Sequence, residues 1–378
     1  MHLRRRFFVP PRCTLRRAQQ RLKTMNPILV RPLCALIMTL STAASVAADG
    51  MKVDAATRSS IVSGLAQAID EQYVFPDKAK LVVKRLEAKE KSGAYADIST
   101  MEELATALTA DLHEPTRDLH LRVRVSAQPL PEIAPEPTPE MEKMMLAYYK
   151  ASNFGVRKIE TLPGNIGYID LRMFASVDAA KDTIGAAMQV VADTDALIVD
   201  LRANGGGDPQ TVAFMSSYLF DKRTHLNDML WRQDGRRESF WTQDEVPGKR
   251  FGGQKKIYVL TSKKTFSGAE EFSYNMQQLK RGTLVGETTG GGAHPGGMHR
   301  LHPHVSVFIP TGRAINPISK SNWEGTGVIP DVPVAADDAL RTAERLALTA
   351  LLQQPRDAMH ADLLRKRLAE VGKQGKAG

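Results

Sequence analysis

The order of elements in the sequence predicts an α/β fold with helical segments on both sides. Residues 196–201 form a nearly continuous apolar run, which is typical of a strand buried on both faces of a sheet. Strand-like and helix-like segments alternate from about residue 153 to residue 334, as expected for an α/β domain. Helical apolar periodicity before residue 112 and after residue 337 predicts an N-terminal helical bundle and a C-terminal helical tail.

The 378 residues carry a formal net charge of +9, but the excess lies entirely in residues 1–48. That segment holds nine Lys and Arg residues and no acid, so the chain from Asp49 onward is formally neutral. The charge balance therefore gives no indication of a nucleic-acid partner.

Residues 1–48 are predicted to be a signal or targeting segment. Residues 1–24 are either an extended basic region of that signal or the result of a start codon placed too early, and the second interpretation, with the start at Met25, is favoured. Arg31 precedes the apolar core Leu33–Leu40, which is too short for a membrane span, and small residues follow at a cleavage site near Ala47. We therefore expect an exported protein, periplasmic or extracellular, with no stable membrane span once the signal is removed.

Both cysteines of the chain, Cys13 and Cys34, lie inside this targeting segment. The mature protein would contain none. Disulfides, thiol catalysis and thiolate metal sites are thereby excluded.

Residues 49–126 are predicted to form a helical domain that ends in a strand. Three apolar stripes of helical spacing come first, and Thr100 is placed to cap the third helix. Leu119–Val125 alternates apolar and polar residues, which predicts a half-buried strand that carries His120. Residues 127–152 follow, with five prolines between positions 128 and 139, and are interpreted as an extended linker.

The α/β domain is assigned to residues 153–336 and the helical tail to residues 337–378. The tail has an apolar stripe that would pack on the domain or on a second subunit, so a homo-oligomer is one expected partner.

The stretch Lys255–Gln278 has the pattern of a strand, a tight turn and a helix, with Ser267 at the start of the helix. Unpaired backbone N–H groups and the positive end of the helix dipole meet there, so a negative charge that develops on an attacked carbonyl would be stabilised. The alternative is structural, because Ser267 and Glu270 also have the spacing of a capping box.

Three other segments contain residues suited to binding or catalysis. The glycine triplet Gly205–Gly207 after the buried strand lets a backbone approach a ligand, or is only a strand-to-helix turn. Glu324, in a glycine-punctuated loop, would orient a histidine or a water, or cap the loop. Residues 294–304 contain four histidines, but their spacing matches no known ligand pattern, and no metal is predicted.

Taken together, these segments resemble the tail-specific, or C-terminal-processing, serine peptidases. The matching blocks are 200–207, 261–272, 286–295 and 323–331, in the order and spacing of that family, and the resemblance covers about residues 118–334. The branch it resembles is that of the tricorn protease core and the repeats of interphotoreceptor retinoid-binding protein. The resemblance implies a ClpP/crotonase-like α/β domain, an N-terminal helical domain and serine peptidase chemistry.

The resemblance also implies roles for single residues. Ser267 would be the nucleophile, but the lysine that pairs with it in the processing-peptidase branch is replaced by Gly291. In the tricorn-like branch a histidine and a glutamate serve instead, which implies His120 as base and Glu324 as the group that orients it, directly or through another group. Leu119 stands where that branch often has Gly or Ser, so an extra hydroxyl beside His120 is not expected.

The backbone N–H groups of Gly268 and Gly206 would hold the oxyanion. The residues expected to contact substrate come from the glycine blocks and their neighbours: Gly205, Gly207, Gly291, Gly292, His294 and Trp323.

The implied partner is a peptide or the C-terminal tail of a protein, with no cofactor. The alternative is a non-catalytic binder of apolar small molecules on the same fold, like the retinoid-binding repeats. A crotonase-like acyl enzyme is less favoured, because no coenzyme A site is evident.

Overall fold

The structure is a computed structural model, and it describes residues 50–131 and 138–374. The chain from Met51 onward belongs to one compact unit. The predicted signal segment and its start at Met25 lie outside the described residues.

Three helices form the N-terminal part, as the apolar stripes predict. They are α2 (Ala55–Gln72), α3 (Pro76–Lys91) and α4 (Met101–Thr116). Thr100 caps α4 in a reciprocal capping box with Glu103, which confirms the predicted cap. Leucines, isoleucines and valines from all three helices meet in one buried core.

This core is closed by a three-stranded antiparallel sheet in the order β1-β10-β9. Its strands are β1 (Arg122–Val125), β9 (Gly296–His302) and β10 (Val305–Pro310). The prediction that His120 lies on a strand is wrong, because β1 begins two residues later. The Asp118 carboxylate accepts the His120 N–H at 3.0 Å and folds residues 118–121 into a turn.

The proline-rich segment is not an extended linker throughout. Helix α5 (Pro139–Ala151) occupies most of its second half, with Thr138 as the cap and Pro139 at the first helical position. No residue of α5 is buried. The predicted linker 127–152 therefore contains a solvent-exposed helix.

The centre of the α/β part is a six-stranded sheet in the order β12-β8-β7-β4-β3-β2. All neighbouring strands pair in parallel except β2 and β3. The strands are β2 (Val156–Leu162), β3 (Ile166–Leu171), β4 (Ala196–Asp200), β7 (Lys256–Thr261), β8 (Thr283–Gly286) and β12 (Val332–Pro333). Every residue of β4 is buried, which confirms the strand predicted from the apolar run.

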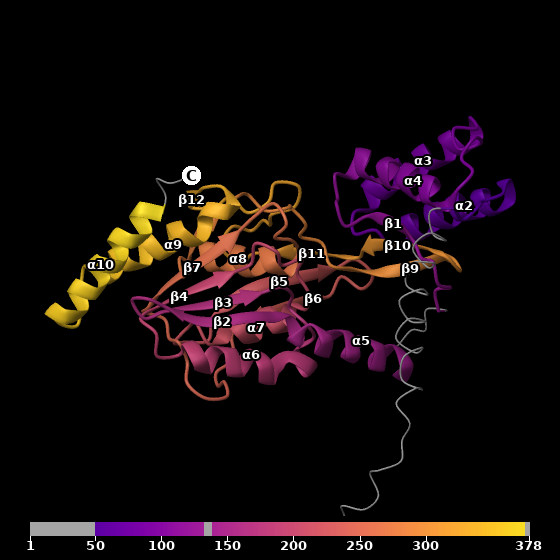
Figure 1. Ribbon diagram of the computed structural model, residues 1–378. Coiled ribbons are helices and arrows are strands. Elements are labelled where there is room, and N and C mark those ends of the chain that lie inside the picture. The colour runs from indigo at the N-terminus through magenta and orange to yellow at the C-terminus, as the bar shows by residue number, and fades with distance from the viewer. Residues whose placement is uncertain (1–49, 132–137, 375–378) are drawn as a thin grey trace, which may run out of the picture. The chain divides into compact units, whose positions relative to one another are not determined.

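Helices cover both faces of this sheet (Figure 1). One face packs against α6 (Val177–Val191), α7 (Pro209–Ser217) and α8 (Gly268–Gln278). The other packs against α9 (Ala336–Leu351) and α10 (Ala358–Gln374). The apolar stripe of the tail therefore lies on the sheet of its own chain. The mixed α/β class with a sheet core and terminal helices is confirmed, and it is consistent with a ClpP-like fold.

A second three-stranded sheet, β11-β5-β6, stands beside the central one. Its strands are β5 (His225–Trp231), β6 (Arg237–Trp241) and β11 (Gly312–Ile315). Met229 and Phe240 of this sheet reach the wall of the cleft described below.

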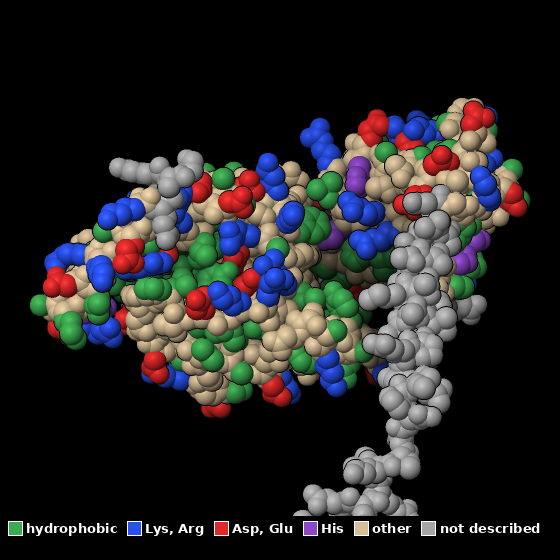
Figure 2. Space-filling model, viewed as in Figure 1, with side chains coloured by type: hydrophobic (Ala, Val, Ile, Leu, Met, Phe, Trp, Pro, Cys, Tyr) green, Lys and Arg blue, Asp and Glu red, His purple; other side chains and the backbone are tan. Residues whose placement is uncertain are grey.

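The distribution of charged side chains on the surface agrees with the formal neutrality of the chain from residue 49 onward. Figure 2 shows basic and acidic side chains interspersed over the face in view. Within residues 50–131 and 138–374, no helix has the length and apolar character needed to cross a membrane.

The helical core gives a direct test of packing. Leu108 of α4 is fully buried, whereas Leu81 of α3 is 57% exposed. We expect Leu108→Ala to lower the free energy of unfolding by about 2–5 kcal/mol, because it leaves a cavity. Leu81→Ala should change it by about 0.5 kcal/mol or less. Urea unfolding of both variants measures the difference, and equal losses would contradict the packing described.

Candidate active site

Ser267 lies in the tight turn between β7 and α8, with φ 54° and ψ −121°. A positive φ is unusual for a residue with a side chain, and such backbone strain gathers at functional sites. A strained strand-to-helix turn is also the geometry that presents the nucleophilic serine in α/β hydrolases. The turn thus lifts Ser267 to the wall of a cleft of about 1070 Å³.

The loop after β4 holds this turn in place. The Thr265 hydroxyl donates to the Leu201 carbonyl at 2.8 Å, and the Phe266 N–H donates to the Asn204 carbonyl at 3.1 Å. Gly206 has a φ of 102°, and a Cβ there would stand 2.7 Å from the Cβ of Ser267. Only glycine permits this approach, so the triplet has a structural reason beyond a simple turn.

Glu270 fastens the turn from the other side. One of its carboxylate oxygens accepts the N–H groups of Ser267 at 2.8 Å and Gly292 at 2.9 Å. The other accepts the Thr289 hydroxyl and the Gly291 N–H. The Glu270 half of the expected capping box is therefore present, and the same carboxylate also ties α8 to the loop 289–292.

The two predicted oxyanion donors, Gly268 and Gly206, differ in the surroundings of their backbone N–H groups. Gly268 is the first residue of α8, beside Ser267. The Gly206 N–H already donates to the Asn204 side chain at 2.8 Å, so the prediction that it is a free donor is wrong. A Cβ on Gly268 would stand 3.1 Å from the nitrogen of Gly207, which lines the cleft. Gly207 is therefore the residue of the triplet that both lines the cleft and lies against Gly268.

His120 lines the same cleft as Ser267. Its ring lies 4.6 Å from the ring of Phe266 and 5.6 Å from that of Phe308, centroid to centroid. Burial lowers its pKa from 6.5 to about 4, although the Asp118 charge acts in the opposite direction. The imidazole is therefore neutral near pH 7 and able to accept a proton.

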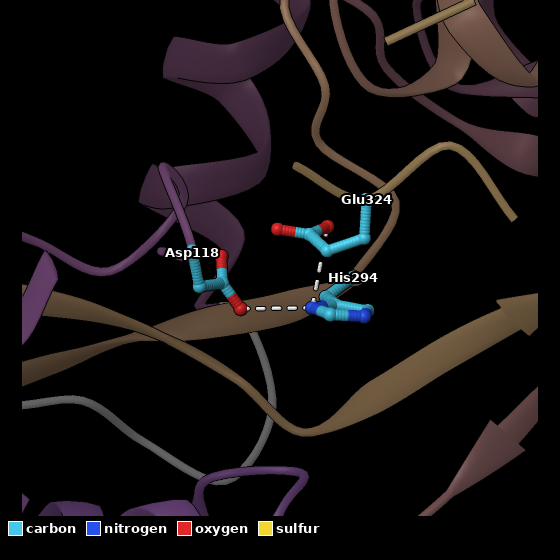
Figure 3. Close-up of side chains that lie close together, drawn as sticks. All are labelled: Asp118, His294 and Glu324. Carbon is cyan, nitrogen blue, oxygen red and sulfur yellow. Dashed lines mark hydrogen bonds and ion pairs between the residues drawn. The ribbon is translucent and has the colours of Figure 1, made fainter. Parts of the chain in front are cut away.

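Three ionisable side chains, Asp118, His294 and Glu324, form a largely buried cluster (Figure 3). His294 Nδ1 lies 2.8 Å from Asp118 Oδ2 and 3.3 Å from Glu324 Oε2. Asp118 Oδ1 in turn lies 3.9 Å from His120 Nδ1. The path from Glu324 to His120 therefore runs through His294 and Asp118.

The protons of this cluster are unevenly shared. Burial, together with the nearby Asp118 charge, raises the pKa of Glu324 to about 8. Burial also acts to raise the pKa of Asp118, but the hydrogen bond and charge of His294 outweigh it, and the pKa is lowered. Asp118 is thus the carboxylate whose ionised form is favoured beside His120, whereas the raised pKa of Glu324 favours its protonated form.

Sequence reasoning missed Asp118, which stands two residues before His120. The available signal was the Asp-x-His spacing, which suits a side chain that accepts a backbone N–H two residues ahead. His294 was expected to contact substrate, but it is 3% exposed and does not line the cleft, because its ring is held by the two carboxyl groups.

The other expected substrate contacts divide in the same way. Gly205, Gly207, Gly292 and Trp323 line the cleft, whereas Gly291 does not. The Gly291 N–H is turned inward to Glu270 instead. The Trp323 indole N–H donates to the Gly292 carbonyl at 2.7 Å, so this buried ring also supports the cleft wall.

The four histidines of 294–304 do not converge on one point. His299 meets Gln72, and His304 meets the Ser126 carbonyl. Among the described residues, the group of three side chains able to hold a metal ion is Asp118, His294 and Glu324. We interpret it as a hydrogen-bonded carboxyl–imidazole cluster, because His294 Nδ1 contacts both carboxyl groups.

Two family models match the chain. Residues 165–334 match peptidase family S41, and residues 41–155 match the N-terminal domain of peptidase S41 in eukaryotic IRBP. The fold and the site thus define a hydrolase of the serine peptidase class. The chain belongs to peptidase family S41.

Two solved structures share the fold at low sequence identity. A candidate peptidase from Parabacteroides merdae is 20% identical, with a TM-score of 0.53 over 77% of this chain and 96% of that one. A lipoprotein from Streptococcus agalactiae is 14% identical, with a TM-score of 0.51 over 78% and 96%. The tricorn protease matches 79% of this chain and 37% of its own, with 15% identity and a TM-score of 0.48.

The glycine at position 292 provides a test of this geometry. A Cβ there would stand 2.3 Å from Phe266 and 2.6 Å from the His120 ring. We expect Gly292→Ala to displace the imidazole and lower the rate of casein hydrolysis more than about tenfold, since misplacement by 1 Å can cost about a hundredfold. Gly297→Ala is the control, because nothing lies within 4 Å of that position. Equal rates for both variants would contradict the described packing around His120.

Proposed function

We propose that this serine peptidase is exported and cleaves peptides or the C-terminal tails of proteins through an acyl-enzyme, with Ser267 as nucleophile. The observation that carries the proposal is the strained turn that presents Ser267 in the same cleft as the neutral His120. The proposal of export rests on the targeting pattern of residues 1–48. The domain boundaries at residues 48, 126, 152 and 336 remain predictions from the sequence.

In the proposed reaction, Ser267 Oγ bonds to the peptide carbonyl carbon while His120 takes the hydroxyl proton. The carbonyl oxygen becomes an oxyanion beside the amides of Gly268 and Gly207, a position where one donor is worth about 3 kcal/mol in comparable sites. The intermediate then breaks its C–N bond, and His120 returns the proton to the leaving amine. Water, activated by the same imidazole, releases the acid and restores Ser267.

In this scheme Asp118 is the carboxylate that lies beside the base, His120, and stabilises it. Its negative charge favours the imidazolium that forms during the reaction, whereas burial opposes that charge. Glu324 acts at one remove, through its contact with His294. This arrangement uses the indirect route that the sequence left open for Glu324.

A fluorophosphonate probe tests the nucleophile. We expect it to label Ser267, as mapped by mass spectrometry, and Ser267→Ala to lose both labelling and casein hydrolysis while it stays folded. His120→Ala should slow labelling by orders of magnitude, because the hydroxyl loses its base. Full labelling of His120→Ala would move the base elsewhere. No labelling of the parent protein would favour the non-catalytic binder of apolar molecules.

The pKa of His120 predicts the pH dependence. A base must be neutral to act, and burial disfavours its charged form, so the neutral form persists to lower pH. We expect kcat/KM to fall on the acid side near pH 4 rather than near pH 6.5. Circular dichroism over the same range separates titration from unfolding. An acid limb near pH 6.5 in a folded protein would contradict the buried His120.

A further inference from the structure

Helix α8, which begins directly after Ser267, carries a second glutamate that takes no part in the proposed reaction. Glu271 is 2% exposed, lines the cleft with Ser267, and its Oε1 has no hydrogen-bond partner among the described residues. Asn227 of β5 lies beside it and is fully buried, with both side-chain polar atoms unpartnered as well. Buried polar groups in native proteins almost always have partners, so this pair calls for one.

The position of Glu271 relates it to the nucleophile. It follows Ser267 by four residues, about one helical turn, so both lie on the same side of α8. The apolar side chains of Met229, Phe240 and Pro209 line the cleft together with it. A substrate side chain that enters here would pass an apolar wall and reach a carboxyl group.

The other acids of the cleft are already occupied. Asp208 accepts the N–H groups of Val177 and Gln210, and Glu238 accepts from Trp231 and Arg236. Among the described residues no lysine or arginine forms an ion pair with Glu271. Its pKa is raised to about 8, mainly by burial; the neighbouring Asn227 side chain acts in the opposite direction and the Asp208 charge in the same direction. A cationic group that arrives at this carboxyl would oppose the effect of burial and favour its ionised form.

We propose that Glu271, with Asn227 beside it, forms a specificity subsite that accepts a lysine or arginine side chain of the substrate. The inference rests on the proposed peptidase function. The aliphatic stem of such a side chain suits the apolar wall, and its charged N–H donors suit the unpartnered Glu271 Oε1. A neutral chain of the same length would leave that oxygen buried and unpaired, which a site built for hydrogen bonds discriminates against strongly.

Cations also line the cleft, and they bear on this assignment. Arg122, Arg124, Lys263 and Lys264 belong to its lining, but all four are exposed. Water and salt screen exposed charges, whereas a nearly buried carboxyl is screened much less. These four exposed cations would therefore weaken a preference for basic substrate side chains without cancelling it.

Two diphenyl aminoalkylphosphonate probes test the subsite, one with the lysine side chain and one with norleucine, which lacks only the terminal ammonium. Each forms a bond from Ser267 Oγ to phosphorus as phenoxide leaves. We expect the intact protein to react with the lysine probe more than about tenfold faster than with the norleucine probe. Glu271→Gln, which keeps the shape but loses the charge, should bring the ratio of the two rates close to one.

Glu238→Gln is the matched control, because Glu238 lines the same cleft but already has partners, and its rate ratio should stay that of the parent. A ratio lost in Glu238→Gln and kept in Glu271→Gln would overturn the assignment. Equal rates in the parent, or labelling of Ser267 by the fluorophosphonate but by neither phosphonate, would overturn the subsite alone. Absence of labelling by all three probes would overturn the proposed function with it.

Discussion

The geometry of the site depends first on the buried carboxylate of Glu270. Four donors surround it: the amides of Ser267, Gly291 and Gly292 and the hydroxyl of Thr289. Burial raises the pKa of Glu270, and these donors act in the opposite direction. A hydrogen bond to a charged group contributes about 1.5–3 kcal/mol, and an unpaired buried carboxylate would cost several. The start of α8 and the loop 289–292 are therefore held as one piece, with Gly292 against the His120 ring.

A second constraint comes from the number of charges that the interior tolerates. Asp118 and Glu324 both contact one imidazole nitrogen, and two ionised carboxyl groups so close together would repel each other. The proton that Glu324 retains removes this repulsion and leaves the charge on Asp118, the carboxylate nearer to His120. His294 joins the two through a contact that spans 176 residues of sequence to Asp118. It connects the turn before β1 with the loop before β9.

The sequence predicted the parts that local patterns determine. The apolar run of β4, the cap of α4 and the strand–turn–helix around Ser267 all follow from neighbouring residues. Helix α5 could also have been found, because Thr138 and Pro139 form a normal helix start, but the count of prolines outweighed that signal. The Asp118–His294 contact could not, since only the tertiary fold brings the two side chains together. The direction of the Gly206 amide likewise depends on the side chain of Asn204.

The adjacent glutamates Glu270 and Glu271, in the first turn of α8, have different roles: one supports the fold, and the other faces the cleft. Consecutive helical residues differ by about 100° around the axis, so Glu270 and Glu271 face different neighbours. Glu270 faces the loop 289–292, where four donors satisfy it, and its burial is a matter of support. Glu271 faces the cleft, where burial is nearly as complete but one oxygen is unpartnered. Since a fold gains nothing by desolvating a carboxyl without partners, the missing partner of Glu271 is best sought in what the cleft binds.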